Sequence, residues 1–163
     1  MTLAELNARD GSSFARVLGS IFEGSPWVAE RASRKKPFAT LDALHDAMIS
    51  VVAAASPEEQ LALLRAHPDL GTRGRMSDTS SREQENAGLD VLTRDELERF
   101  TTLNRAYREK FGFPFLYAVK GSTKRDILEA LERRLLSTRD AEYQEALQQV
   151  HRIARFRLEE AIS

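Results

Sequence analysis

Apolar side chains recur at spacings of three and four along most of the chain, which is the repeat of one buried face on an α-helix. After Thr40 this face is traced by Leu41, Leu44, Met48, Val51 and Val52. Helix starts recur as well: Ser56 is a candidate N-cap, Pro57 stands at the first helical position, and Glu59 has the spacing of a capping box. The pattern predicts an all-α fold, a bundle of about seven to nine helices.

The segment GFPFLYAVKG, residues 112–121, lacks this repeat. It is aromatic, contains Pro114 and is bounded by glycines. Residues 116–119 could form a short strand, but a lone strand has no partner here, so we expect an extended, buried connector. Gly112 is a favourable C-terminal cap for the helix before it. The sequence shows no internal repeat or linker, and we expect a single domain over residues 1–163.

The composition is that of an ordinary globular domain, with 42% hydrophobic and 30% charged residues. Its 24 basic and 25 acidic side chains give a net charge of -1, which argues against a nucleic-acid partner. The absence of cysteine excludes disulfides, thiolate metal sites and cysteine nucleophiles. No apolar run has the length of a membrane span, and neither end carries a secretory or peroxisomal signal. We therefore expect a cytoplasmic protein with no membrane partner.

The last predicted helix places an arginine on its apolar face. Arg157 falls within a stripe of residues spaced by three, four and seven, which are Leu147, Val150, Ala154 and Ala161. Arg155 shares the opposite, polar face and should be solvated. A buried guanidinium is costly unless it is paired and hydrogen-bonded. Two interpretations of Arg157 are equally open: an internal ion pair, or a clamp for a carboxylate or carbonyl of a ligand.

Three histidines are the candidates for acid/base chemistry near neutral pH. Pro68 disfavours helical geometry at His67, so a helix should end there and leave the imidazole beside a glycine-bearing loop, where sites tend to be built. The alternative for His67 is a histidine that the dipole of a helix C-terminus favours. We interpret His45 as a hydrogen-bonded core residue and His151 as a solvated residue on a polar face. His67 is therefore the first candidate of the three.

Ser80, Glu83 and Gln84 lie three and four positions apart and share one helical face. Ser80 and Glu83 have the spacing of a capping box, which is a purely local device. The same helix start could instead present a hydroxyl, a carboxylate and an amide to a polar ligand. The sequence contains no His-Glu-x-x-His motif and no paired cysteines, so we expect no metal site.

Several segments, taken in order, carry a family resemblance. The chain resembles the 2-oxo-4-hydroxy-4-carboxy-5-ureidoimidazoline (OHCU) decarboxylases of urate breakdown in FEGSPWVAERA, KPF, LLRAHPDLG, SSREQENAGLD, FTTLNRAYREKFGFPFLYAVKG and RIARFRL. The resemblance implies an all-helical, cofactor-free enzyme that acts after urate oxidase and hydroxyisourate hydrolase. Its substrate would be a small-molecule ureide, OHCU, and its product (S)-allantoin.

The resemblance also implies roles for particular residues. His67 matches the family's catalytic histidine, Glu83 lies in the matching Ser-x-x-Glu-Gln substrate-binding segment, and Arg157 matches the arginine of the family's terminal Arg-Leu pair. We expect Glu83 and Arg157 to be catalytic together with His67. Substrate contacts are implied for the matching positions Pro68, Ser80, Gln84, Phe115, Leu116, Tyr117, Ala118 and Val119. The loop over residues 71–79 is variable within the family, so the resemblance implies no role for its residues.

The implied substrate carries a carboxylate and a hydroxyl on one ring carbon, next to a C=N bond that can accept the electron pair left by CO2. We therefore expect no cofactor. Two alternatives stay open: a non-catalytic helical interaction module, in which the polar residues form a structural cluster, and an enzyme that acts on a related ureide. A homodimer is also open, because FEGSPW, residues 22–27, could offer apolar surface to a second copy.

Overall fold

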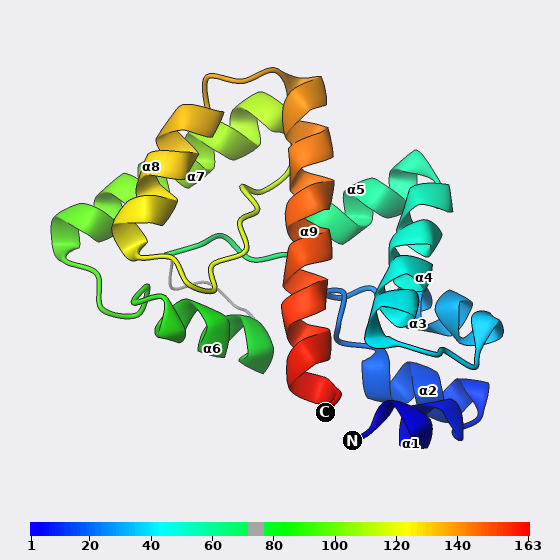
Figure 1. Cartoon of the computed structure of the whole chain (residues 1–163). Helices are drawn as coiled ribbons and strands as arrows, with labels where there is room; N and C mark the ends of the chain where they lie inside the picture. Colours follow the sequence, from blue (N-terminus) through cyan, green and yellow to red (C-terminus); the bar gives the residue numbers. More distant parts are fainter. Residues whose placement is uncertain (72–76) are drawn as a thin grey trace. The chain divides into compact units, whose positions relative to one another are not determined.

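The computed structural model describes residues 1–71 and 77–163. Within these residues the chain forms nine α-helices, one short 3-10 helix and no strand (Figure 1). The elements are α1 (Leu3–Asn7), α2 (Gly11–Leu18), α3 (Trp27–Ala32), η1 (Ser33–Lys35), α4 (Leu41–Ala54), α5 (Pro57–Arg65), α6 (Asp78–Asn86), α7 (Arg94–Phe111), α8 (Lys124–Arg134) and α9 (Arg139–Ala161). The expected all-α class is confirmed. Most of the loop over residues 71–79 lies outside the described residues.

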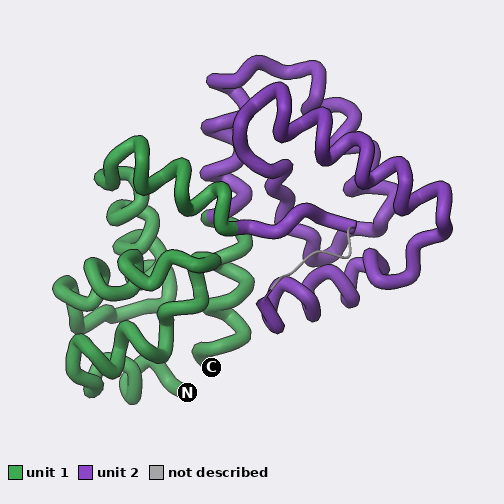
Figure 2. Tube along the Cα trace, turned by 180° about the vertical axis from the view of Figure 1, so that it is seen from behind, with its two compact units in different colours: residues 1–66, 151–163 green, residues 67–150 purple. Residues whose placement is uncertain are grey.

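Two compact units make up the chain (Figure 2). Unit 1 contains Met1–Ala66 and His151–Ser163, and unit 2 contains His67–Val150. The long helix α9 therefore contributes its first residues to unit 2 and its last residues to unit 1. That the two units act as a single domain stays a prediction.

Unit 1 is built on helices that begin at local start signals. The side chains of Thr40 and Ser56 accept the N–H groups of Ala43 and Glu59 at the beginnings of α4 and α5, and the capping box expected at Ser56 is present. Helix α3 packs against both α2 and α4. The core of unit 1 is formed by fully buried apolar side chains, among them Leu6, Phe14, Val28, Leu44, Met48 and Leu63.

The segment expected to offer apolar surface, residues 22–27, lies largely inside unit 1. Phe22 is 1% exposed. Trp27 is half-buried, and the Arg31 guanidinium lies 4.7 Å from the centroid of its ring. These two aromatic side chains therefore leave little apolar surface for a second copy, and a homodimer stays a prediction.

Unit 2 has an aromatic core around the connector between α7 and α8. Residues 112–121 form neither helix nor strand, and Phe113 and Phe115 are fully buried. The Tyr107 ring of α7 lies against both, with centroids 6.0 and 5.5 Å away. Gly112 ends α7 in the left-handed conformation, with φ 83°, as a C-terminal cap requires. The expected buried, non-helical connector is confirmed.

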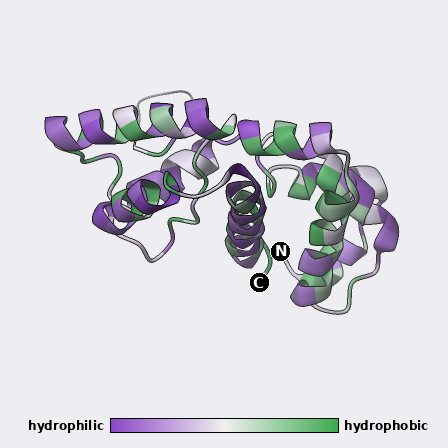
Figure 3. Ribbon diagram, turned by 90° about the horizontal axis from the view of Figure 1, so that it is seen from above, coloured by the Kyte–Doolittle hydropathy of each residue, from purple (hydrophilic) through white to green (hydrophobic). Residues whose placement is uncertain are grey.

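Hydrophilic residues interrupt the hydrophobic ones along the helices (Figure 3). This alternation gives most helices one apolar face, which covers a core, and one polar face. Among the described residues, none of the helices combines the length and the hydrophobicity that a membrane span requires.

Candidate active site

His67 is the first residue of unit 2 and follows directly after the end of α5. The helix ends at Arg65 with Ala66 as its C-cap, as the position of Pro68 predicts. His67 is 5% exposed and Pro68 is half-buried. The expected place of the imidazole at a helix exit is confirmed, and its catalytic role stays a prediction.

A glutamine of α6 holds the backbone that follows His67. The Gln84 side chain accepts the N–H of Gly71 (3.0 Å) and donates to the carbonyl of Asp69 (3.3 Å). Gly71 has φ 72°, and a Cβ at this position would lie 2.8 Å from Cγ of Phe100. The turn at Gly71 therefore requires glycine for its conformation and for the close packing of an aromatic ring.

Two side chains of α7 hold the same backbone. Asn104 donates from Nδ2 to the carbonyl of Leu70 (2.8 Å), and Arg108 donates from Nε to the Asp69 carboxylate (2.8 Å). Asn104 is 1% exposed, whereas the Arg108 side chain is 41% exposed. Residues 69–71, here called the anchored segment, are thus tied to two helices of unit 2.

The beginning of α6 differs from the prediction. Ser77, and not Ser80, is the N-cap: its side chain accepts the N–H of Ser80, and the helix begins at Asp78. The predicted capping box of Ser80 and Glu83 is therefore wrong. The run SDTSS offers hydroxyls at several neighbouring positions, and the cap is the one at which the backbone is still extended, with ψ 159° at Ser77.

The three polar residues predicted on one face of this helix do belong to it. Ser80 and Gln84 are 5% and 6% exposed, and Glu83 is half-buried. Because the cap is Ser77, the hydroxyl of Ser80 does not serve as the cap of α6. The interpretation of Ser80 as a ligand-binding residue stays a prediction.

The connector is held by side chains from α8 and α9. Arg134 donates from Nη1 to the carbonyl of Leu116 (2.6 Å), and Gln149 accepts the N–H of Ala118 at Oε1 (2.9 Å). The Tyr117 side chain between them is half-buried. The backbone expected to meet a ligand is therefore itself fixed by two buried side chains.

Arg134 belongs to a buried ion pair. Its Nε lies 2.8 Å from Oε1 of Glu142, and the two side chains are 8% and 4% exposed. The Tyr107 hydroxyl donates to the same carboxylate oxygen (2.6 Å). Burial, and then the hydrogen bond to Glu142, raises the pKa of Tyr107 far above its ordinary value. The phenol therefore stays protonated and acts as a donor to the carboxylate.

Arg157 is buried in unit 1, as its place on the apolar face predicts. Its Nη1 lies 2.8 Å from Oε2 of Glu23, and the two side chains are 4% and 9% exposed. The same nitrogen donates to the carbonyl of Ser20 (3.2 Å). Arg155, by contrast, is partly exposed and pairs with Glu159 on its own helix. The internal ion pair is confirmed as one role of Arg157, and its role toward a ligand stays a prediction.

The other two histidines lie in unit 1. Nε2 of His45 is 2.8 Å from the carbonyl of His151, in agreement with a hydrogen-bonded His45. His151 is half-buried, and burial, with a smaller effect from His45, lowers its pKa to about 4. The expectation of a solvated His151 is therefore wrong, because His45 of α4 lies against this part of α9.

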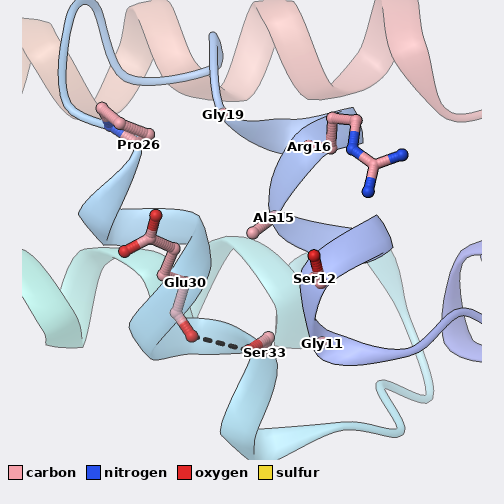
Figure 4. Close-up of a pocket in the computed structure, with 8 residues that line it drawn as sticks. All are labelled: Gly11, Ser12, Ala15, Arg16, Gly19, Pro26, Glu30 and Ser33. Atoms are coloured by element: carbon pink, nitrogen blue, oxygen red, sulfur yellow. Dashed lines mark hydrogen bonds between the residues drawn. The ribbon is translucent and has the colours of Figure 1, made fainter.

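A surface pocket of about 590 Å³ lies between α2 and α3 of unit 1 (Figure 4). It is lined by Gly11, Ser12, Ala15, Arg16, Gly19, Pro26, Glu30 and Ser33. None of the predicted site residues lines it. Among the described residues, no group of three or more histidine, aspartate or glutamate side chains is placed to hold a metal ion.

Apart from Gln84, the side chains that hold the anchored segment and the connector are not among the residues that the sequence singled out. Asn104 lies on the buried face of α7 that contains Phe100 and Tyr107, and Arg134 follows the buried Leu131 at a spacing of three. Both could be recognised in the same way as Arg157, since a polar residue within an apolar stripe is buried and needs a partner. The identity of the partner is not visible in that pattern.

Within its described residues, this is an all-α protein. A buried histidine precedes the anchored segment, and helices that follow later in the chain hold an aromatic connector. A crystal structure of (S)-allantoin synthase has the same fold, with a TM-score of 0.83 and 37% sequence identity. That match covers 99% of this chain and 54% of the other.

The family model of OHCU decarboxylase matches residues 7–159. The uric acid degradation bifunctional protein PucL of Bacillus subtilis (strain 168) is 51% identical over 99% of this chain and 33% of that protein. The 2-oxo-4-hydroxy-4-carboxy-5-ureidoimidazoline decarboxylase of Haloferax volcanii is 49% identical over 100% of this chain and 97% of that protein. The chain thus spans about a third of the bifunctional relative and nearly all of the second one. It belongs to the OHCU decarboxylase family.

Proposed function

We propose that this chain decarboxylates OHCU to (S)-allantoin in urate degradation. The observation that carries the proposal is the match to the OHCU decarboxylase family over residues 7–159, together with coverage of 97% of a relative that bears this name. The setting of His67 supports it, because a buried imidazole at a helix exit is followed by a tightly held backbone. We place the activity in a single-domain, cytoplasmic enzyme that needs neither a cofactor nor a metal ion.

The reaction breaks the bond between ring carbon 4 and its carboxylate, and CO2 leaves. The electron pair forms a double bond to carbon 5, and the pair of the former C=N bond moves to nitrogen, which takes up a proton. The resulting enol loses its hydroxyl proton while carbon 5 gains one, which gives the keto form of allantoin. One proton is consumed for each CO2 released. Because the substrate supplies its own electron sink, the protein has to orient groups and move protons.

His67 is the acid/base in this proposal. Its imidazole takes the hydroxyl proton of the enol intermediate and delivers a proton to carbon 5. Glu83 hydrogen-bonds the imidazole or the ureido group and fixes its orientation. Arg157 binds a carboxylate or a ring carbonyl, for which a guanidinium is suited by its charge and its several donors. Pro68 packs beside the ring. The buried position of His67 and the half-buried position of Glu83 support these roles.

The remaining polar edge of the substrate is read by Ser80, Gln84 and the connector. Gln84 already bonds two backbone groups, but a carboxamide keeps a second lone pair and a second N–H for a ligand. Leu116 and Ala118 are engaged by side chains of the protein. With the Leu116 carbonyl and the Ala118 N–H engaged in this way, we assign the ligand contact to the backbone of Tyr117, with flanking residues from 115 to 119 packing around it.

The test combines the purified chain with freshly made product of hydroxyisourate hydrolase and follows circular dichroism. We expect rapid formation of one allantoin enantiomer. His67→Ala should lower kcat by about 10²–10⁴-fold, the usual contribution of general acid/base catalysis, without a large change in Tm. His67→Asn separates proton transfer from positioning, and His151→Gln is a matched histidine control that should keep kcat.

A wild-type chain that does not accelerate the loss of CO2, or a fully active His67→Ala variant, would contradict the proposal. Allantoin should also raise the Tm of the wild-type chain, because a ligand that binds only the native state stabilises it. A non-catalytic interaction module would show no such shift.

A further inference from the structure

We infer that Asn104 is a positioning residue for His67: its side-chain amide fixes the carbonyl of Leu70, and with it the backbone that carries the imidazole. The inference rests on the proposed role of His67. It adds a residue that touches neither the substrate nor the reacting atoms in the proposal above. All residues involved belong to unit 2.

The hydrogen bond of Asn104 is buried at both ends. Asn104 is 1% exposed and Leu70 is 8% exposed, and the donor–acceptor distance is 2.8 Å. Asn104 lies in the middle of α7, an 18-residue helix, between the buried Leu103 and Tyr107. Its amide is therefore carried by a rigid, well-packed element, and water cannot easily replace it as the donor to the Leu70 carbonyl.

The chain between Leu70 and His67 has little freedom to absorb a displacement. Only Pro68 and Asp69 lie between them, and the ring of Pro68 fixes its φ angle. Asp69 is in turn held through its carboxylate by Arg108. A shift of the Leu70 carbonyl is therefore transmitted to the imidazole.

Loss of the Asn104 donor would leave a buried carbonyl without its partner. A buried backbone acceptor normally finds a hydrogen bond, so the anchored segment would move to restore one. Displacement of a reacting group by about 1 Å can cost about 10²-fold in rate. We expect Asn104→Leu to lower kcat by about 10- to 100-fold and to change KM by less than about threefold, because Asn104 makes no assigned substrate contact.

Asn7 provides a matched control in unit 1. Its amide also donates to a backbone carbonyl at 2.8 Å, that of Phe38, and it accepts the N–H of Phe38 at 2.9 Å. Asn7→Leu thus removes a comparable side-chain-to-backbone tie away from the anchored segment. We expect this variant to lose stability while it keeps the kcat of the wild-type chain.

The decisive measurement is a double-mutant cycle with His67→Asn. If Asn104 acts through the imidazole, Asn104→Leu causes no further loss of kcat in the His67→Asn background. A kcat of Asn104→Leu within about threefold of wild type, or losses that multiply in the double variant, would overturn the inference. If Asn104→Leu does not fold, Asn104→Ala removes the donor with a smaller side chain that favours a helix, and it should give the same result. A wild-type chain without activity, or a fully active His67→Asn variant, would instead overturn the proposed function.

Discussion

Each unit buries an arginine against a glutamate, but the two pairs are built differently. In unit 1, Arg157 near the end of the chain pairs with Glu23 near its beginning, at 2.8 Å. In unit 2, Arg134 pairs with Glu142, only eight positions away, across the turn between α8 and α9. The first pair joins distant parts of the sequence, whereas the second joins neighbouring helices.

The two arginines share a second task. Each also donates to a backbone carbonyl outside the helices, Arg157 to that of Ser20 and Arg134 to that of Leu116. In unit 2 the glutamate additionally accepts the hydroxyl of Tyr107. The non-helical backbone of unit 2, on which most of the proposed site depends, is thus part of a larger buried polar network. The two buried arginines therefore hold irregular backbone segments as well as pairing with buried glutamates.

The largest stability effect should come from breaking the pair of unit 2. Arg134→Met leaves the buried Glu142 carboxylate without its charged partner, although it still accepts the hydroxyl of Tyr107. Removal of one partner of a buried ion pair costs about 3–5 kcal/mol of stability. Chemical denaturation measures this loss. The double variant Arg134→Met/Glu142→Leu should recover part of it, because two apolar side chains replace two charges. A loss below about 1 kcal/mol in the single variant would show that this pair does not support unit 2.

The pair of unit 1 allows structure and chemistry to be separated. Glu23→Gln and Arg157→Met both break it and should each cost about 3 kcal/mol. If Arg157 also binds the substrate, Arg157→Met lowers kcat/KM by at least about tenfold more than Glu23→Gln, since an ionic contact to substrate is lost as well. Steady-state kinetics of the two variants, measured at a temperature at which both are folded, decide between the two roles of Arg157. Equal kcat/KM values would leave Arg157 with a structural role alone.

The smallest of these effects is a pH dependence of the stability of unit 1. Burial lowers the pKa of His151 to about 4, below the ordinary value of 6.5, so the unfolded chain binds this proton more readily than the folded one. Stability that is complete above about pH 6.5 should therefore fall as the pH decreases toward 4, by on the order of 2 kcal/mol after allowance for partial exposure. Denaturation midpoints across this range test it. His151→Gln should flatten the slope, and an unchanged slope would assign the effect to other groups.

Local signals were sufficient for much of the fold. The capping box at Ser56, the end of α5 before His67 and the left-handed cap at Gly112 all depend on residues within a few positions of each other. The start of α6 was misjudged because Ser77 and Ser80 both lie in a run of hydroxyl-bearing residues. Propensity alone does not choose among such neighbours, since the cap is decided by where the chain enters the helix.

In the candidate site, too, local patterns predicted some features and not others. The helical repeat was sufficient to show that Arg157 is buried, because periodicity depends only on the geometry of one helix. It did not show that Glu23 is its partner. His151 was misjudged for a related reason, since its surroundings depend on His45 of another helix.

The sequence by itself determined the all-α class, the buried connector and the burial of Arg157, and it singled out His67. These features follow from spacing within one element, where 3.6 residues per turn or a single proline decides the outcome. Only the tertiary structure decided that Asn104, Gln84 and Arg108 hold residues 69–71 and that Arg134 holds Leu116. Such contacts depend on the path of the chain through space, which brings together donors and acceptors that no local pattern relates.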